Sequence, residues 1–189
     1  LICLLLFLTK KYKNMACLLT SGRGLGCKSS VGGLKAIYFA DYGTLGTENI
    51  AAGEITGFTG TPVWFKFEIK GASTLENTIT SSRENGTTFY TQNLNITLPI
   101  LDKATQEEIK ILSVSRPHVA VEDYNGNFFL VGLENGAEVT GGTIVTGAAM
   151  GDLSGFTLVL EGQEKAPAYF VTSTIITDDV SAVSIDPNA

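Results

Sequence analysis

VWFKFEIK, residues 63–70, is the stretch that decides the fold class, because its apolar and polar side chains alternate. Successive side chains of a strand point to opposite faces, so this alternation defines two different faces. One face carries Val63, Phe65, Phe67 and Ile69, and the other carries Trp64, Lys66, Glu68 and Lys70. The pattern predicts an antiparallel strand with the first face buried and the second face exposed.

Segments with the same strand character lie on both sides of this stretch. The turn dipeptide Asn125-Gly126 joins two of them into a hairpin. Strand character is found in residues 37–40, 54–57, 63–70, 87–99, 119–132, 156–161 and 168–172, more weakly in 72–82, and as short pieces among turns in 138–139 and 143–146. We therefore expect a mainly β protein, an antiparallel β-sandwich or barrel of about seven or eight strands.

LDKATQEEIKILS, residues 101–113, departs from this alternation and predicts the one convincing α-helix. Its apolar side chains near one face are Leu101, Ala104, Ile109 and Leu112. Asp102 is available as the N-cap, and Arg116-Pro117 ends the helix. We expect this helix to flank the sheets.

The chain has 189 residues, which is the length of one domain with an arm. Residues 1–14 run from eight apolar residues into three lysines, whereas a signal peptide carries its positive charge first. We expect them to be upstream-translated or leader sequence outside the fold, with the protein starting at Met15, the alternative being an atypical export or anchor segment. Residues 15–36 predict an extended Gly-rich docking arm, 37–175 a single β domain and 176–189 a C-terminal tail.

The composition excludes several classes of function. Hydrophobic residues make up 44% and charged residues 17%, so the chain can build a core. The net charge is −6, and without residues 1–14 it is 10 − 19 = −9, which argues against binding nucleic acid through a basic patch. One histidine and three cysteines leave little for a metal cluster or a disulfide framework.

Several motifs match known site chemistry only weakly. GRGLGCKS, residues 22–29, has Cys27 where a phosphate-binding loop needs glycine, so we expect a flexible arm. A Ser-His-Asp triad would need a nucleophile motif such as Gly-x-Ser-x-Gly, which the chain lacks, so His118 is expected to be structural. The adjacent carboxylates Glu122-Asp123 and Asp178-Asp179 point to opposite faces of a strand, which predicts solvated turns or rims.

Trp64 has two readings that the sequence leaves open. With Lys66 on the same predicted face it could form a sugar-binding platform, or it could lie in a subunit interface.

The second half of the chain carries a sequence of motifs with a family resemblance. These are the strand FYTQNLNITLP, the helix LDKATQEEIKIL, the hairpin VAVEDYNGNFFLVGLENGAEVTGG and the closing segment GDLSGFTLVLEGQEKAPAYF. Their order resembles virion structural proteins of tailed bacteriophages, most of all tail tube proteins of phages that infect Bacteroidetes. The N-terminal ACLLTSGRGLGCKSSVGGLKAIYFADYG is similar to the opening of such proteins.

The resemblance implies a hexameric ring of this chain that stacks into a hollow tube. DNA would then pass along the lumen as cargo without specific binding, and the other partners would be virion tail proteins. The location would be the virion tail, assembled in the host bacterial cytoplasm, with no membrane partner, cofactor, metal or catalytic residue.

The subunit contacts expected on this reading come from the arm and from the exposed strand face. They are Leu18, Leu19, Leu25, Val31, Leu34 and Trp64. The rival hypothesis is a secreted or surface β-sandwich binding module, carbohydrate-binding or adhesin-like, supported by the apolar N-terminus and Trp64.

Overall fold

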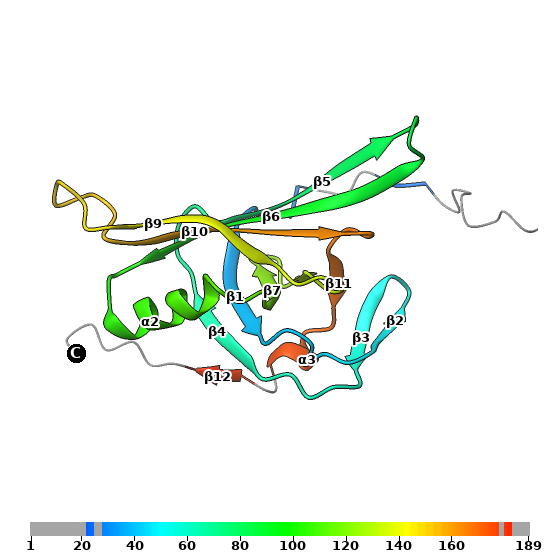
Figure 1. Ribbon diagram of the computed structural model, residues 1–189, viewed down its shortest axis with the longest axis horizontal. Helices are drawn as coiled ribbons and strands as arrows, with labels where there is room; N and C mark the ends of the chain where they lie inside the picture. The colour runs from blue at the N-terminus through cyan, green and yellow to red at the C-terminus, as the bar shows by residue number, and fades with distance from the viewer. Residues whose placement is uncertain (1–21, 25–27, 178–179, 183–189) are drawn as a thin grey trace, which may run out of the picture. The chain divides into compact units, whose positions relative to one another are not determined.

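Twelve strands and two short helices make up the described part of the chain, residues 22–24, 28–177 and 180–182 of the computed structural model (Figure 1). All of them belong to one unit that starts at Val31. The elements are β1 (Leu34–Ala40), β2 (Glu48–Ala51), β3 (Glu54–Phe58), β4 (Trp64–Glu68), β5 (Thr74–Ser82), β6 (Thr87–Pro99), α2 (Lys103–Leu112), β7 (His118–Asp123), β8 (Phe128–Val131), β9 (Glu138–Val145), β10 (Gly155–Glu164), β11 (Tyr169–Val171), α3 (Thr174–Thr177) and β12 (Val180–Ala182). The mainly β fold class is confirmed, with more strands than the seven or eight expected.

The strands form two sheets. The larger sheet has the order β12-β4-β1-β7-β8-β11-β3-β2, and the smaller has the order β5-β6-β10-β9. Most neighbours are antiparallel, but β11 pairs with β3, and β12 with β4, in parallel. Neither strand order closes on itself within the described residues, which fits a sandwich rather than a barrel.

The first hydrophobic core lies between the two sheets. The smaller sheet contributes alternate residues of two neighbouring strands, so that Leu94 of β6 lies opposite Leu160 of β10. The larger sheet contributes Ile37, Phe39, Val119 and Val121. Helix α2 adds Ile109 and Leu112. This core is the one that the alternating pattern predicts.

A second core lies on the other face of the larger sheet. Its buried members are Ala36, Tyr38, Ala40, Leu45, Ile55, Trp64, Ala120, Phe128, Leu130, Val171 and Ile176. Because both faces are covered, β1 and β7 carry runs of buried residues rather than an alternation of buried and exposed ones. Ile176 of α3 belongs to this core, although the sequence assigns it to a C-terminal tail. The fold also begins earlier than residue 37, since β1 starts at Leu34.

The second core explains why the predicted faces of residues 63–70 are partly wrong. Trp64 is 0% exposed and belongs to the second core, whereas Phe65 on the opposite face is exposed. Phe67 still packs on the first core, where its ring meets the ring of Phe39 edge-on at 5.1 Å between centroids. A strand that is covered on both sides at one end cannot be assigned a single buried face from its pattern.

The flanking helix is confirmed. The Asp102 carboxylate accepts a hydrogen bond from the backbone nitrogen of Thr105 at 2.9 Å, which is the predicted N-cap interaction. Thr105, Ile109 and Leu112 form the buried face, whereas Ala104 is exposed. The spacing of the three buried positions is that of a single helical stripe.

Candidate functional site

One face of the smaller sheet points away from the first core, and we call it the outer face. In β6, residues such as Asn95 and Thr97 alternate with the buried Leu94, Ile96 and Leu98. From the strand register, the outer face consists of Thr74, Glu76, Thr78 and Thr80 of β5, Phe89, Thr91, Asn93, Asn95 and Thr97 of β6, Glu138, Gly141 and Thr143 of β9, and Thr157, Val159, Glu161 and Gln163 of β10. These residues include glutamates but no lysine or arginine, so the outer face is polar and acidic.

The two edge strands of the smaller sheet, β5 and β9, are open within the described part of the chain. They have 9 and 8 residues, and neither contains proline, lysine or arginine. Long edges without such residues are ready to pair with another strand. All neighbours in the order β5-β6-β10-β9 are antiparallel, so β9 runs opposite to β5. A rotation about an axis along the strands keeps the strand directions, so two copies related in this way can lie side by side. Strand β5 of one copy can then pair antiparallel with β9 of the next.

The residues that the sequence analysis assigned to a subunit interface are not brought together. Val31 is 61% exposed, but Leu34 and Trp64 lie in the two cores. The expectation that Trp64 is exposed is wrong, and its ring is accessible neither to a partner nor to a sugar. Leu18, Leu19 and Leu25 lie outside the described residues, as do residues 25–27 of the GRGLGCKS segment.

Val31 is held through its backbone. Its nitrogen donates to Oδ1 of Asn125 at 2.9 Å, and its carbonyl oxygen accepts from Nδ2 of Asn125 at 2.7 Å. The turn between β7 and β8 that carries Asn125 is stabilised by Asp123, whose carboxylate accepts from Asn125 and Asn127. Burial opposes ionisation of Asp123, but these hydrogen bonds outweigh it and lower the pKa of the carboxyl. The turn therefore fixes the point at which the β domain begins.

His118 is structural in its surroundings. Its Nδ1 lies 2.6 Å from the carbonyl oxygen of Gly132, and its Nε2 accepts from the backbone nitrogen of Gly43 at 3.0 Å. The Tyr42 ring stacks on the imidazole, and the Arg116 guanidinium lies 4.0 Å over that ring. Burial lowers the pKa of His118, although the Gly132 carbonyl opposes this. Both nitrogens of the imidazole are therefore engaged by backbone groups.

Glu122 departs from the solvated position expected for it. It is 7% exposed, and its carboxylate accepts from Nζ of Lys35 and, at 3.0 Å, from the hydroxyl of Tyr38. Burial, reinforced by Glu122, raises the pKa of Tyr38 well above its usual range. The neighbouring Asp123 lies in the turn, as expected. Asp178 and Asp179 lie outside the described residues.

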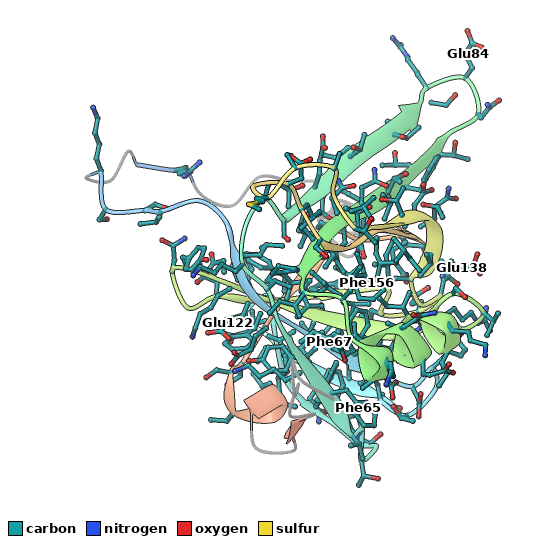
Figure 2. All side chains as sticks on the ribbon, turned by 90° about the vertical axis from the view of Figure 1, so that its left-hand side faces the viewer. Phe65, Phe67, Glu84, Glu122, Glu138 and Phe156 are labelled. Atoms are coloured by element: carbon teal, nitrogen blue, oxygen red, sulfur yellow. The ribbon has the colours of Figure 1, made fainter. Side chains whose placement is uncertain are left out.

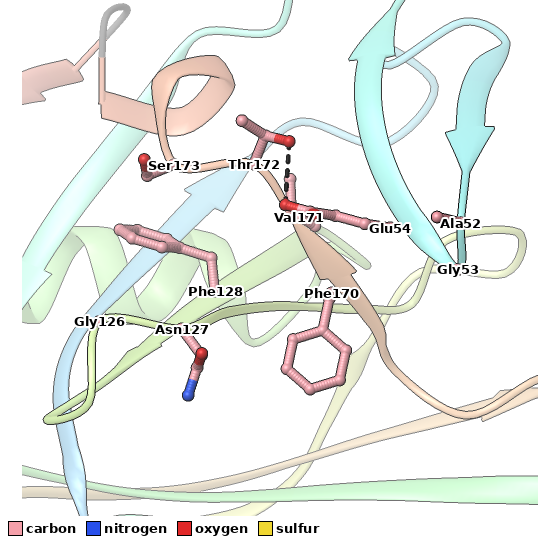
Figure 3. Close-up of a pocket in the computed structure, with 10 residues that line it drawn as sticks. All are labelled: Ala52, Gly53, Glu54, Gly126, Asn127, Phe128, Phe170, Val171, Thr172 and Ser173. Atoms are coloured by element: carbon pink, nitrogen blue, oxygen red, sulfur yellow. Dashed lines mark hydrogen bonds between the residues drawn. The ribbon is translucent and has the colours of Figure 1, made fainter.

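A polar notch of about 360 Å³ lies where β3, β8 and β11 meet (Figure 3). We call it the Glu54–Phe170 notch. It is lined by the turns Ala52-Gly53 and Gly126-Asn127 and by Glu54, Phe128, Phe170, Val171, Thr172 and Ser173. Glu54 accepts a hydrogen bond from the Thr172 hydroxyl at 2.9 Å, and the Phe170 ring is 49% exposed. The sequence gives no signal for this notch, because a parallel pairing brings Glu54 and Phe170 together.

The described residues contain no group of three or more His, Cys, Asp or Glu side chains placed to hold a metal ion. Nor does any helix among them have the length and apolar character needed to cross a bilayer. Comparison of the chain with protein-family models, curated proteins and solved structures found no match.

Proposed function

We propose that this protein is a virion structural protein that self-assembles into rings, and that the rings stack into the tail tube of a bacteriophage. Its role is structural rather than enzymatic. The observation that carries the proposal is the smaller sheet, which combines two open edges with an outer face free of lysine and arginine.

The open edges support ring formation. Pairing of β5 with β9 of the next copy satisfies backbone groups that an isolated protomer leaves to water. The contact is heterologous, because it joins two different edges of the protomer. It closes into a ring when a whole number of equal rotations between neighbouring copies completes one full turn. Because the smaller sheet is antiparallel and has an even number of strands, neighbouring strands stay antiparallel across such a contact.

The outer face supports a role as the wall of a DNA conduit. Lysine and arginine side chains bind phosphates and would hold DNA in place. The outer face instead has hydroxyl and amide groups with Glu76, Glu138 and Glu161 among them. Like charge on the wall keeps a polyanion mobile. Continuous pairing of the smaller sheets would place this face on one side of the ring.

The rival hypothesis of a carbohydrate-binding or adhesin-like module has lost one of its two supports. Trp64 is completely buried, and the apolar N-terminus lies outside the described residues. A structural self-assembling role remains the function that the described surfaces favour.

Light scattering and negative-stain electron microscopy of the full chain over a range of concentrations test the proposal. We expect masses of several protomers together with rings or tubes. A monodisperse monomer at high concentration would contradict it.

A matched pair of glycine variants tests edge pairing. An added side chain meets nothing within 4 Å at Gly141 of β9 or at Gly151 in the following loop, so both variants should fold. Gly141→Lys places a charge on the edge strand and is expected to abolish rings, whereas Gly151→Lys should assemble as the parent does. Assembly of Gly141→Lys at the parent concentration would exclude pairing through β9.

A further inference from the structure

The Glu54–Phe170 notch has the chemistry of a site for a cationic side chain. Glu54 is the one charged residue among the described residues that line it, and Oε1 of its carboxylate accepts from the Thr172 hydroxyl. Beside it, Phe170 exposes 49% of its surface. A carboxylate and an accessible aromatic ring that line the same notch suit a guanidinium group, which can form an ion pair with the first and stack on the second.

The notch is preformed by the strands around it. Glu54 lies opposite Phe170 in the parallel pairing of β3 with β11, so the carboxylate and the ring are held on adjacent strands. The Phe170 ring also contacts Phe129 at 4.7 Å between centroids, which limits its motion. The Ala52-Gly53 turn that closes one side has positive φ at both residues, the geometry of a tight two-residue hairpin.

Arg83 is the matching cation. It lies in the turn between β5 and β6, whose hairpin extends beyond the rest of the fold, with Glu84 at its tip (Figures 1 and 2). Among the described residues, no ion pair, hydrogen bond or ring contact involves the Arg83 side chain. By contrast, the Arg116 guanidinium is already stacked on Tyr42.

We propose that the Glu54–Phe170 notch receives the Arg83 side chain of a second copy of this chain. The occupant is assigned from charge complementarity, since an exposed arginine on the projecting hairpin matches an acidic, aromatic notch whose described lining residues include no basic one. The contact is distinct from edge pairing, because it uses the tip of the β5–β6 hairpin and a notch in the larger sheet. This inference depends on the self-association proposed above and adds a second type of contact to it.

Charge substitution tests the contact. Arg83→Gln removes the cation, and Glu54→Gln removes the anion but keeps an acceptor for the Thr172 hydroxyl. We expect each to raise the protomer concentration needed for half-association by about tenfold or more, because one partner of a close charge pair is lost. The exchanged variant Arg83→Glu/Glu54→Arg should recover most of this loss, which a merely structural effect of either residue would not do.

Two controls make the result decisive. Lys103→Glu changes an exposed lysine at the start of α2 and should leave association unchanged, while urea unfolding checks that every variant is folded. If Arg83→Gln and Glu54→Gln associate like the parent while Gly141→Lys does not, the notch contact is excluded and edge pairing stands. If the parent chain itself never associates, both proposals fail.

Discussion

The central strands of the two sheets differ in how many of their faces are buried. In the larger sheet, β1 and β7 are buried on both faces, so their side chains build two cores. In the smaller sheet, β6 and β10 bury one face and present hydroxyl and amide groups on the other. The larger sheet therefore contributes to two cores and the smaller sheet to one, which leaves the outer face of the smaller sheet for the assembly proposed above.

The largest expected effect is at Trp64, which belongs to the doubly covered sheet. Trp64→Ala should lower the free energy of unfolding by about 3–5 kcal/mol in urea denaturation, because it removes a fully buried ring. Trp64→Phe is the control, since it keeps a ring and deletes an indole nitrogen that has no hydrogen-bond partner among the described residues. It should lose clearly less stability than Trp64→Ala. Equal losses would mean that the second core does not depend on the ring.

A smaller effect is expected at the buried Glu122 cluster. Tyr38→Phe removes the hydroxyl that donates to Glu122 at 3.0 Å and leaves the buried carboxylate with Lys35 alone. We expect a loss of about 1–3 kcal/mol in the free energy of unfolding. Tyr124→Phe changes an exposed tyrosine and should alter stability by less than about 0.5 kcal/mol. If the two variants have the same free energy of unfolding, the Tyr38–Glu122 hydrogen bond contributes nothing to stability.

His118 of β7 should make stability depend on pH. Its pKa in the folded protein is lowered from the ordinary value of 6.5, so the unfolded chain takes up a proton more readily. The free energy of unfolding should therefore fall as pH drops below 6.5, towards the lowered pKa of the folded protein. The measurement is urea unfolding at several pH values for the parent and for His118→Gln. The variant should lack the fall in the free energy of unfolding that His118 causes. An identical pH profile in both proteins would contradict this role of His118.

The smallest effect on folding is expected on the outer face. Asn95 is exposed on β6, so Asn95→Ala should change the free energy of unfolding by less than about 0.5 kcal/mol. A loss above about 1 kcal/mol would show that the outer face is packed in the protomer. Such a result would remove the contrast between the two sheets.

Much of the fold could be predicted from local sequence signals. The N-cap at Asp102 and the turn at Asn125-Gly126 occur where the pattern indicates them. Residues 87–99 form one long strand, as their alternation predicts. These features depend on backbone preferences and on spacing within a few residues, so a single chain segment contains the necessary information.

Less of the candidate site than of the fold could be predicted from the sequence. The polar positions of β6 are visible as the alternate residues of its pattern, yet nothing local says that they face a shared surface with β9 and β10. The predicted interface residues agree least with the structure, because Leu34 and Trp64 are core residues. An apolar side chain looks the same in a sequence whether another sheet or another subunit covers it.

The sequence by itself determined most of the strands, the flanking helix and the acidic balance of the chain, because periodicity and charge are properties of the residues in order. The tertiary structure alone decided that the larger sheet is covered on both faces, which buries Trp64. It also decided that β11 lies beside β3, which creates the Glu54–Phe170 notch. Both outcomes depend on which distant segments meet, and the pairing of residues more than a hundred positions apart leaves no periodic trace in either segment.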